Sequence, residues 1–150
     1  MSESTLPSMR VDGQVALVTG AGRGIGRGCA IALAEAGAEV IAMSRTEAEL
    51  KEVVAEIQDA GGTATPVVCD VSDGAAVRER ISEIQELDIL VNNAGILRAS
   101  SLLELSEEDL DAMLQINCRG AVLVAQAAVQ IMERQGSGVV INMSSTFGVN

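Results

Sequence analysis

Apolar residues along the chain follow two alternating patterns. Short continuous runs such as VALVT, residues 15–19, have the length and composition of strands that are buried on both faces. Longer stretches place apolar residues three, four and seven positions apart, as at Leu50, Val53, Val54 and Ile57, which puts them on one face of a helix. The pattern predicts strands at residues 15–19, 39–43, 63–68, 87–92 and 138–143.

Helices are predicted between these strands. One follows residue 25 and ends at Gly37, and others span about residues 46–60, 73–86 and 106–133, the last with Ser106 as its cap. Strands that alternate with helices are typical of a parallel sheet with helices on both faces. Right-handed crossovers then give a doubly wound α/β sheet of order 3-2-1-4-5, with the third strand, which contains Pro66, at an edge. Ligands bind such sheets at the carboxyl ends of the strands.

Composition limits the kind of partner. The 150 residues suit a single domain, predicted over residues 13–150 after a flexible polar tail at 1–12. A net charge of −11 and a pI of about 4.3 argue against nucleic acid and anionic membrane as partners. No apolar run is long enough for a bilayer, and the N-terminus lacks the apolar segment of a secretory signal. We therefore expect a cytoplasmic protein.

The residue types exclude several chemistries. The chain has no histidine, so Ser-His-Asp catalysis, Cys-His catalysis and histidine-ligated zinc cannot be built from it. Its three cysteines, Cys29, Cys69 and Cys118, lack the spacing of a metal site, and we interpret them as reduced, mostly buried thiols. No metal site is predicted.

The most informative stretch is QVALVTGAGRGIGRG, residues 14–28. Its glycines lie between the first predicted strand and the first predicted helix, where bare backbone amides and the helix N-terminus form a phosphate cradle. The dinucleotide pattern G-x-G-x-x-G does not fit, because Ile25 or Arg27 stands where its third glycine belongs. A P-loop does not fit either, because Arg27 and Gly28 replace its lysine and hydroxyl residue.

The spacing that fits is T-G-x-x-x-G-x-G, residues 19–26, and N-N-A-G follows at residues 92–95. With these motifs the chain resembles the short-chain dehydrogenase/reductase family over about residues 12–149. The resemblance implies a Rossmann fold with a nicotinamide dinucleotide on the glycine loop. The loop residues expected to bind it are Gly20, Arg23, Gly24, Ile25 and Gly26.

The residues after the second strand indicate which dinucleotide is used. In NAD-binding sheets an acidic residue there binds the ribose 2′-hydroxyl, but this chain has Ser44 and Arg45. Serine can donate a hydrogen bond to a 2′-phosphate, and Arg45 together with Arg23 can pair with it. We therefore expect NADP(H) rather than NAD(H), the alternative being that Arg45 is a solvated loop charge. Glu47 and Glu49 are expected to point outward.

The resemblance assigns further cofactor contacts to the ends of the third and fourth strands. It implies that Asp70 accepts a hydrogen bond from the adenine amino group and that the backbone of Val71 meets the ring. The alternative is that Asp70 only caps a turn before Ser72. The N-N-A-G residues expected at the cofactor ribose are Asn93, Ala94 and Gly95.

Catalytic residues are also implied by the resemblance. Asn117 lies in the longest predicted helix, where asparagine is unfavourable, and the family has a catalytic asparagine with a local kink at this site. Ser145, after the fifth strand, corresponds to the serine that donates a hydrogen bond to the substrate oxygen, and Ser144 would be structural. The implied reaction interconverts a carbonyl and a secondary alcohol by hydride transfer.

The chain departs from the family in one respect. The family's acid/base is a tyrosine with a lysine four residues on, but this chain has no tyrosine and its only lysine is Lys51. We expect an N-terminal fragment of a longer reductase, inactive by itself and usually dimeric or tetrameric at full length. The alternative is a non-catalytic dinucleotide-binding module or redox sensor. The substrate is a small carbonyl or alcohol of unidentified structure.

Overall fold

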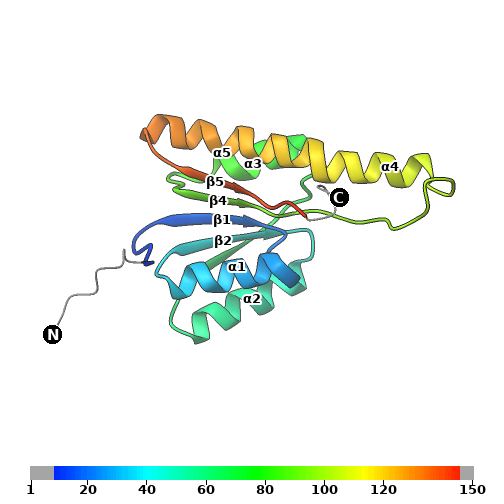
Figure 1. The fold of residues 1–150 in the computed structure, drawn as a ribbon. Coiled ribbons are helices and arrows are strands. Elements are labelled where there is room, and N and C mark those ends of the chain that lie inside the picture. Colours follow the sequence, from blue (N-terminus) through cyan, green and yellow to red (C-terminus); the bar gives the residue numbers. More distant parts are fainter. Residues whose placement is uncertain (1–8, 146–150) are drawn as a thin grey trace.

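A computed structural model describes residues 9–145, which form a five-stranded sheet between two layers of helices (Figure 1). The strands are β1 (Val15–Thr19), β2 (Glu39–Ser44), β3 (Thr63–Val68), β4 (Ile89–Asn92) and β5 (Val139–Asn142). The helical elements are α1 (Gly24–Glu35), α2 (Glu47–Asp59), α3 (Gly74–Ser82), α4 (Glu107–Met113), the π-helical segment η1 (Leu114–Gly120) and α5 (Ala121–Gln135).

The sheet has the predicted topology. Its order is β3-β2-β1-β4-β5, and every neighbouring pair is parallel. In register, Leu17 of β1 lies opposite Ile41 of β2 and Leu90 of β4. The order reverses between β1 and β4, so the carboxyl ends of these strands form the switch point where ligands bind such sheets. β3, which contains Pro66, is an edge strand as expected.

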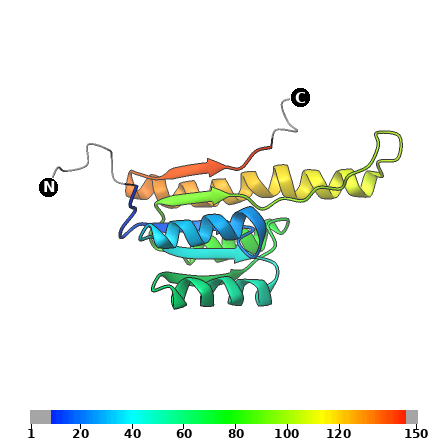
Figure 2. The ribbon, with the colours of Figure 1, turned by 60° about the horizontal axis from the view of Figure 1, so that its bottom comes forward.

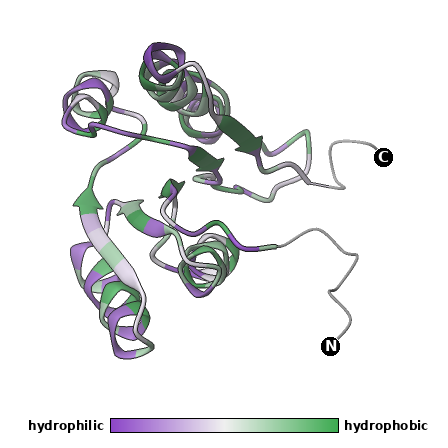
Figure 3. Ribbon diagram, turned by 90° about the vertical axis from the view of Figure 1, so that its left-hand side faces the viewer, coloured by the Kyte–Doolittle hydropathy of each residue, from purple (hydrophilic) through white to green (hydrophobic). Residues whose placement is uncertain are grey.

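Two helical layers bury the two faces of the sheet. α1 and α2 cover one face, and α3 and α5 cover the other (Figures 1 and 2). Successive residues of β1 contribute to opposite faces, since Ala16 and Val18 join the core under α1 and α2 while Leu17 joins the core under α5. Burial on both faces explains why the central strands β1 and β4 are continuous apolar runs, whereas the edge strand β3, with the sequence TATPVV, is mostly exposed and less hydrophobic (Figure 3).

Several elements are shorter than predicted, among them β4 and α3, and β5 spans residues 139–142 rather than 138–143. β4 begins at Ile89 rather than at residue 87, because the backbone of Leu87 pairs with a side chain from α5 instead of a strand. Leu87 N donates to Gln135 Oε1 at 2.8 Å, and Gln135 Nε2 donates to Leu87 O at 3.1 Å. α3 ends at Ser82 rather than at about residue 86. At the other end of this helix, Asp73 caps the N-terminus by accepting hydrogen bonds from the amides of Ala75 and Ala76.

The longest helix is interrupted. The sequence predicts one helix over residues 106–133, whereas the structure has α4, the π-helical segment η1 and α5 in succession. Ser106 caps α4 as predicted, and its Oγ accepts a hydrogen bond from Asp109 N at 3.1 Å. A π-helical segment inside an α-helix often marks a functional site. The local departure expected around Asn117 is therefore observed, in π-helical form.

Apolar side chains remain exposed on one flank of the molecule. Within the part of the chain that the structure describes, β5 pairs only with β4. Val139 and Ile141 on β5 are about half exposed, and Val122 at the start of α5 is about two thirds exposed. By length and composition alone, Glu107–Gln135 is also the one helical stretch within residues 9–145 that would suffice to cross a membrane. Because α5 packs against the sheet through Val124 and Ile131, this is weak evidence for a span. The expectation that the chain avoids membranes stays a prediction.

Candidate functional site

Two adjoining hollows open at the carboxyl ends of the strands. The glycine-loop cavity, of about 520 Å³, lies between the glycine loop and the ends of β2 and β3. The Asn117 cavity, of about 1140 Å³, lies between η1, the start of α5 and the residues that follow β4 and β5. Both are lined by residues 93–96 and by Ile25, so the two hollows form one crevice across the switch point.

Nearly all the predicted cofactor residues line the glycine-loop cavity. The exception is Gly26, which is buried beneath the loop. A Cβ on Gly26 would lie 2.2 Å from Gly20 O and 2.4 Å from Asn93 Nδ2, so only glycine fits there. The residues that do line the cavity are Gly20, Arg23, Gly24, Ile25, Ser44, Arg45, Asp70, Val71, Asn93, Ala94 and Gly95.

The glycine loop delivers α1 to the crevice with a bare N-terminus. Gly20 and Gly24 have φ angles of 65° and 56°, a conformation that side chains disfavour. Arg23 occupies the N-cap position without a side-chain cap, and α1 has no acidic residue in its first turn. The first amides of α1 and the positive end of its dipole therefore remain available to an anion. This is the arrangement that binds phosphate groups in dinucleotide sites.

A hydrogen-bond network fixes the strand ends around this loop. Thr19, fully buried at the end of β1, accepts hydrogen bonds at Oγ1 from the amides of Asn93 and Ala94, both at 3.0 Å. Asn93 Nδ2 returns a hydrogen bond to Thr19 O at 3.0 Å. Asn92 Nδ2 donates to Ala121 O at 2.8 Å and to Asn142 Oδ1 at 3.1 Å. The amides of Asn92 and Asn93 thus tie neighbouring strands together, and the motifs gave no indication of the role of Thr19.

Asp70 forms the turn that its alternative reading predicted. Its Oδ1 accepts hydrogen bonds from Ser72 N at 2.9 Å and Ser72 Oγ at 2.7 Å, and its Oδ2 lies 3.7 Å from Arg45 Nη1. Partial burial by itself raises the pKa of Asp70, but the hydrogen bonds from Ser72 and the charge of Arg45 outweigh it, so the pKa lies below its usual value. The adenine contact stays a prediction beside this observed turn.

Asn117 uses its whole side-chain amide on a single residue. Its Oδ1 accepts from Ile96 N and its Nδ2 donates to Ile96 O, both at 2.8 Å. The segment after β4 is thereby fixed to η1. A second link was missed from the sequence, because Gln115 Nε2 and Arg119 Nη1 both donate to Ser72 O, at 3.1 Å and 3.0 Å. η1 therefore connects the turn after β3 with the segment after β4.

Ser145 and Asn117 line the same cavity, as the resemblance implied, together with Ser144 and Cys118. None of the described residues that line the Asn117 cavity carries a carboxylate, phenol, amine or imidazole. The described lining can orient a carbonyl or hydroxyl group through hydrogen bonds. It does not include a general acid or base of these types.

Two sequence interpretations are corrected here. Glu49, expected to point outward, is half-buried and lines the glycine-loop cavity beside Gly22, whereas Glu47 is exposed and paired with Lys51 at 2.7 Å. Glu49 faces the cavity because α2 starts directly above the glycine loop. Cys118 is exposed rather than buried, because it lies on the side of η1 that lines the open cavity. Within residues 9–145 no three possible ligands cluster as a metal site would require.

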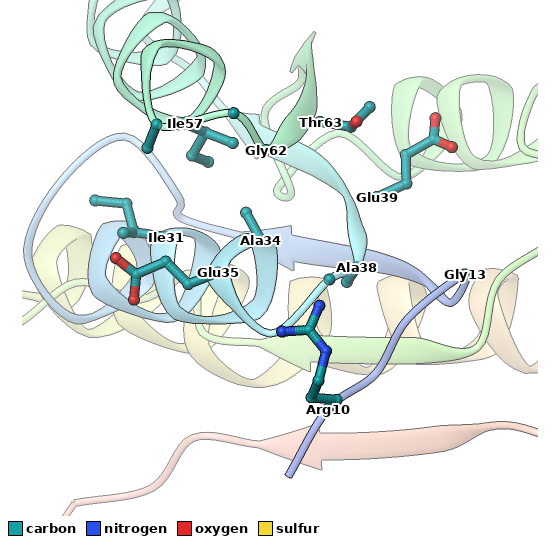
Figure 4. Close-up of a pocket in the computed structure, with 13 residues that line it drawn as sticks. Arg10, Gly13, Ile31, Ala34, Glu35, Ala38, Glu39, Ile57, Gly62 and Thr63 are labelled. Atoms are coloured by element: carbon teal, nitrogen blue, oxygen red, sulfur yellow. The ribbon is translucent and has the colours of Figure 1, made fainter. Parts of the chain in front are cut away.

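Another hollow, of about 440 Å³, lies at the opposite edge of the sheet, where β2 and β3 begin (Figure 4). It is lined by Ala38 and Gly62 together with the charged residues Arg10, Glu35 and Glu39. Arg10 is ion-paired with Asp12. None of the residues predicted to bind a ligand lies there, so the crevice at the carboxyl ends is the candidate site.

Known proteins are similar to this chain in sequence. The sequence model described as short chain dehydrogenase matches residues 14–150. The 3-oxoacyl-acyl-carrier-protein reductase of Thermotoga maritima is 37% identical over 145 residues, which cover 94% of this chain and 59% of that protein.

Solved structures agree in fold. A short-chain type dehydrogenase/reductase from Mycobacterium marinum superposes with a TM-score of 0.92 at 36% identity, covering 95% of this chain and 60% of that one. A gluconate 5-dehydrogenase from Burkholderia cenocepacia, crystallised with NADP and tartrate, gives a TM-score of 0.87 at 40% identity over 92% of this chain and 56% of that one.

The chain spans between half and three fifths of the length of the first curated relatives that it matches. The family match nevertheless extends from the first strand through every described element of the sheet. The motifs, the sheet order and the comparisons agree that this chain belongs to the short-chain dehydrogenase/reductase family.

Proposed function

We propose that this chain is the dinucleotide-binding part of an oxidoreductase that uses NADP(H) to interconvert a carbonyl and a secondary alcohol. The observation that carries the proposal is the bare N-terminus of α1 at the switch point, bordered by glycines and fixed by Thr19 and Asn93. The nicotinamide ring of the bound cofactor would supply or accept the hydride. Neighbours solved with NADP, such as the gluconate 5-dehydrogenase, support this class of cofactor.

The chain's own residues fit the parts of such a cofactor. The amides at Gly24, Ile25 and Gly26 would receive the pyrophosphate. Asp70 and Val71 line the end of the glycine-loop cavity where the adenine would lie, and the residues after β4 line the part shared by both cavities. Arg23, Ser44 and Arg45 would surround a 2′-phosphate, which supports NADP(H) over NAD(H).

The described residues supply part of the catalytic machinery. Ser145 would donate a hydrogen bond to the substrate oxygen, and Asn117, with its amide engaged by Ile96, would hold the proton path through its backbone carbonyl. The described lining of the Asn117 cavity has no carboxylate, phenol, amine or imidazole, so we expect nucleotide binding without turnover from these 150 residues alone. The expected homo-oligomer and cytoplasmic location stay predictions.

A pair of glycine variants tests the binding proposal. Gly26→Ala places a methyl group 2.2 Å from Gly20 O and should weaken NADP+ binding, measured by titration calorimetry, by at least about tenfold. Gly28→Ala is the matched control, because a Cβ there meets nothing within 4 Å, and it should bind as the wild type does. Circular dichroism checks that both variants fold. Equal affinity of the two variants, or no binding by the wild type, would contradict the proposal.

A further inference from the structure

Glu49 places a carboxylate inside the proposed nucleotide site. It is half-buried in the first turns of α2 and lines the glycine-loop cavity with Arg23, Ser44 and Arg45. The position of a Cβ on Gly22 would be 2.7 Å from Glu49 Oε2 and 3.1 Å from Ser44 Oγ. The carboxylate of Glu49 and the hydroxyl of Ser44 thus both lie close to Gly22 of the glycine loop.

The carboxylate of Glu49 takes part in no ion pair among residues 9–145, whereas Glu47 on the same helix is paired with Lys51, Oε1 to Nζ at 2.7 Å. Arg45, which is expected to pair with the 2′-phosphate, instead has its Nη1 3.7 Å from Oδ2 of Asp70. The cavity lining therefore contains the unpaired carboxylate of Glu49 and the guanidinium of Arg45, which is shared with the carboxylate of Asp70.

The two nicotinamide dinucleotides would interact with this carboxylate in opposite ways. The ribose 2′-hydroxyl of NAD(H) can donate a hydrogen bond to a carboxylate, which is the role of the acidic residue at the end of the second strand in NAD-binding sheets. The 2′-phosphate of NADP(H) is itself an anion, and two like charges at close range in a partly buried site repel each other. In this chain Ser44 occupies the position of that acidic residue at the end of β2. The carboxylate of Glu49 reaches the same region of the cavity from α2 instead.

We propose that Glu49 is a specificity-determining residue, which opposes the 2′-phosphate of NADP(H) and accepts the 2′-hydroxyl of NAD(H). It thereby counteracts Arg23 and Arg45, and the site binds both dinucleotides with only a moderate preference for NADP(H). The inference rests on the proposed function, since it assigns a role within the same nucleotide site.

The test is the ratio of the dissociation constants for NADP+ and NAD+, measured by titration calorimetry on the whole chain. Glu49→Gln keeps the size and polarity of the side chain and removes only its charge. It should shift the ratio about tenfold toward NADP+, equivalent to about 1.4 kcal/mol. Glu52→Gln is the matched control, because Glu52 is an exposed carboxylate on α2 that does not line the cavity, and it should leave the ratio unchanged.

A pair of smaller probes isolates the 2′-phosphate. Adenosine 2′,5′-bisphosphate should gain affinity in Glu49→Gln, whereas adenosine 5′-monophosphate should not, and the gain should shrink at high salt. Glu49→Ala should shift the nucleotide ratio in the same direction, so the test does not depend on one variant.

The outcomes separate the two proposals. Intact binding with an unchanged ratio in both Glu49 variants, or an equal shift in Glu52→Gln, overturns this inference alone. Failure of the wild-type chain to bind either nucleotide overturns the proposed function and this inference with it.

Discussion

Replacing Thr19 by valine removes a single oxygen from the centre of the network that holds the crevice together. Thr19 is fully buried, and its Oγ1 accepts hydrogen bonds from the amides of Asn93 and Ala94, both at 3.0 Å. Valine has nearly the same shape, so the substitution leaves two backbone N–H groups without their acceptor and changes little else. The carboxyl ends of β1 and β4 would then lose the side-chain link that positions the segment after β4.

The expected cost follows from the penalty for unsatisfied donors. A buried donor without a partner costs about 1–3 kcal/mol, and because Asn93 and Ala94 are only partly buried we expect about 2–3 kcal/mol for the two. For a domain of this size that corresponds to a fall in Tm of roughly 4–12 °C. The chain has no tryptophan or tyrosine, so urea unfolding is followed by far-ultraviolet circular dichroism rather than by intrinsic fluorescence.

Two further variants isolate the cause. Thr19→Ser keeps the acceptor and loses a buried methyl group, which costs about 0.5–1.5 kcal/mol, so it should be less destabilising than Thr19→Val. Thr63→Val makes the same chemical change at an exposed residue of β3 and should have little effect on stability. If Thr19→Val is as stable as Thr19→Ser, the acceptor is unimportant and the reasoning is refuted.

Two other predictions concern η1 and the turn after β3. Asn117→Ala removes both hydrogen bonds to Ile96, so amide hydrogen exchange at Ile96 should accelerate while exchange in the core of β1 stays unchanged; equal protection of Ile96 in both proteins would contradict the assigned link. The pKa of Asp70 is lowered in the folded state, so its ionised form stabilises the fold above about pH 4, and this stabilisation is lost as the pH falls further toward the folded-state pKa. Asp70→Asn should therefore flatten the decline of unfolding free energy between about pH 5 and pH 2, measured by urea titration, and an unchanged slope would refute it.

The positions that sequence reasoning located correctly share a physical cause. Strands buried on both faces must be continuous apolar runs, and helices over a sheet must repeat their apolar residues every three to four positions, so the elements could be located before any coordinates. Right-handed crossovers between parallel strands then gave the order of the sheet. The glycine loop could also be located from the sequence, because the structure requires glycine itself at such a position. Gly26 packs so closely against Gly20 O that no other residue fits there. Such features depend on residue type at each position, which a sequence states directly.

Other features depend on contacts between elements that are distant in the chain. Periodicity places Gln135 on α5, but it does not show that its amide satisfies the backbone of Leu87, which precedes it by 48 residues. Likewise, the link from Arg119 to Ser72 O spans 47 residues and exists only because η1 crosses the turn after β3. No local pattern marks these partners.

The sequence alone therefore determined the alternation of strands and helices, the order of the sheet, and the edge at which the motifs gather, because local burial, backbone sterics and the right-handed crossover of parallel strands dictate them. Only the tertiary structure decided how far the crevice extends, that η1 is π-helical, and that Glu49 faces the glycine-loop cavity rather than solvent. Those outcomes depend on how α2 and η1 pack above the strand ends, and the direction of a side chain at such a junction is set by its neighbours in space.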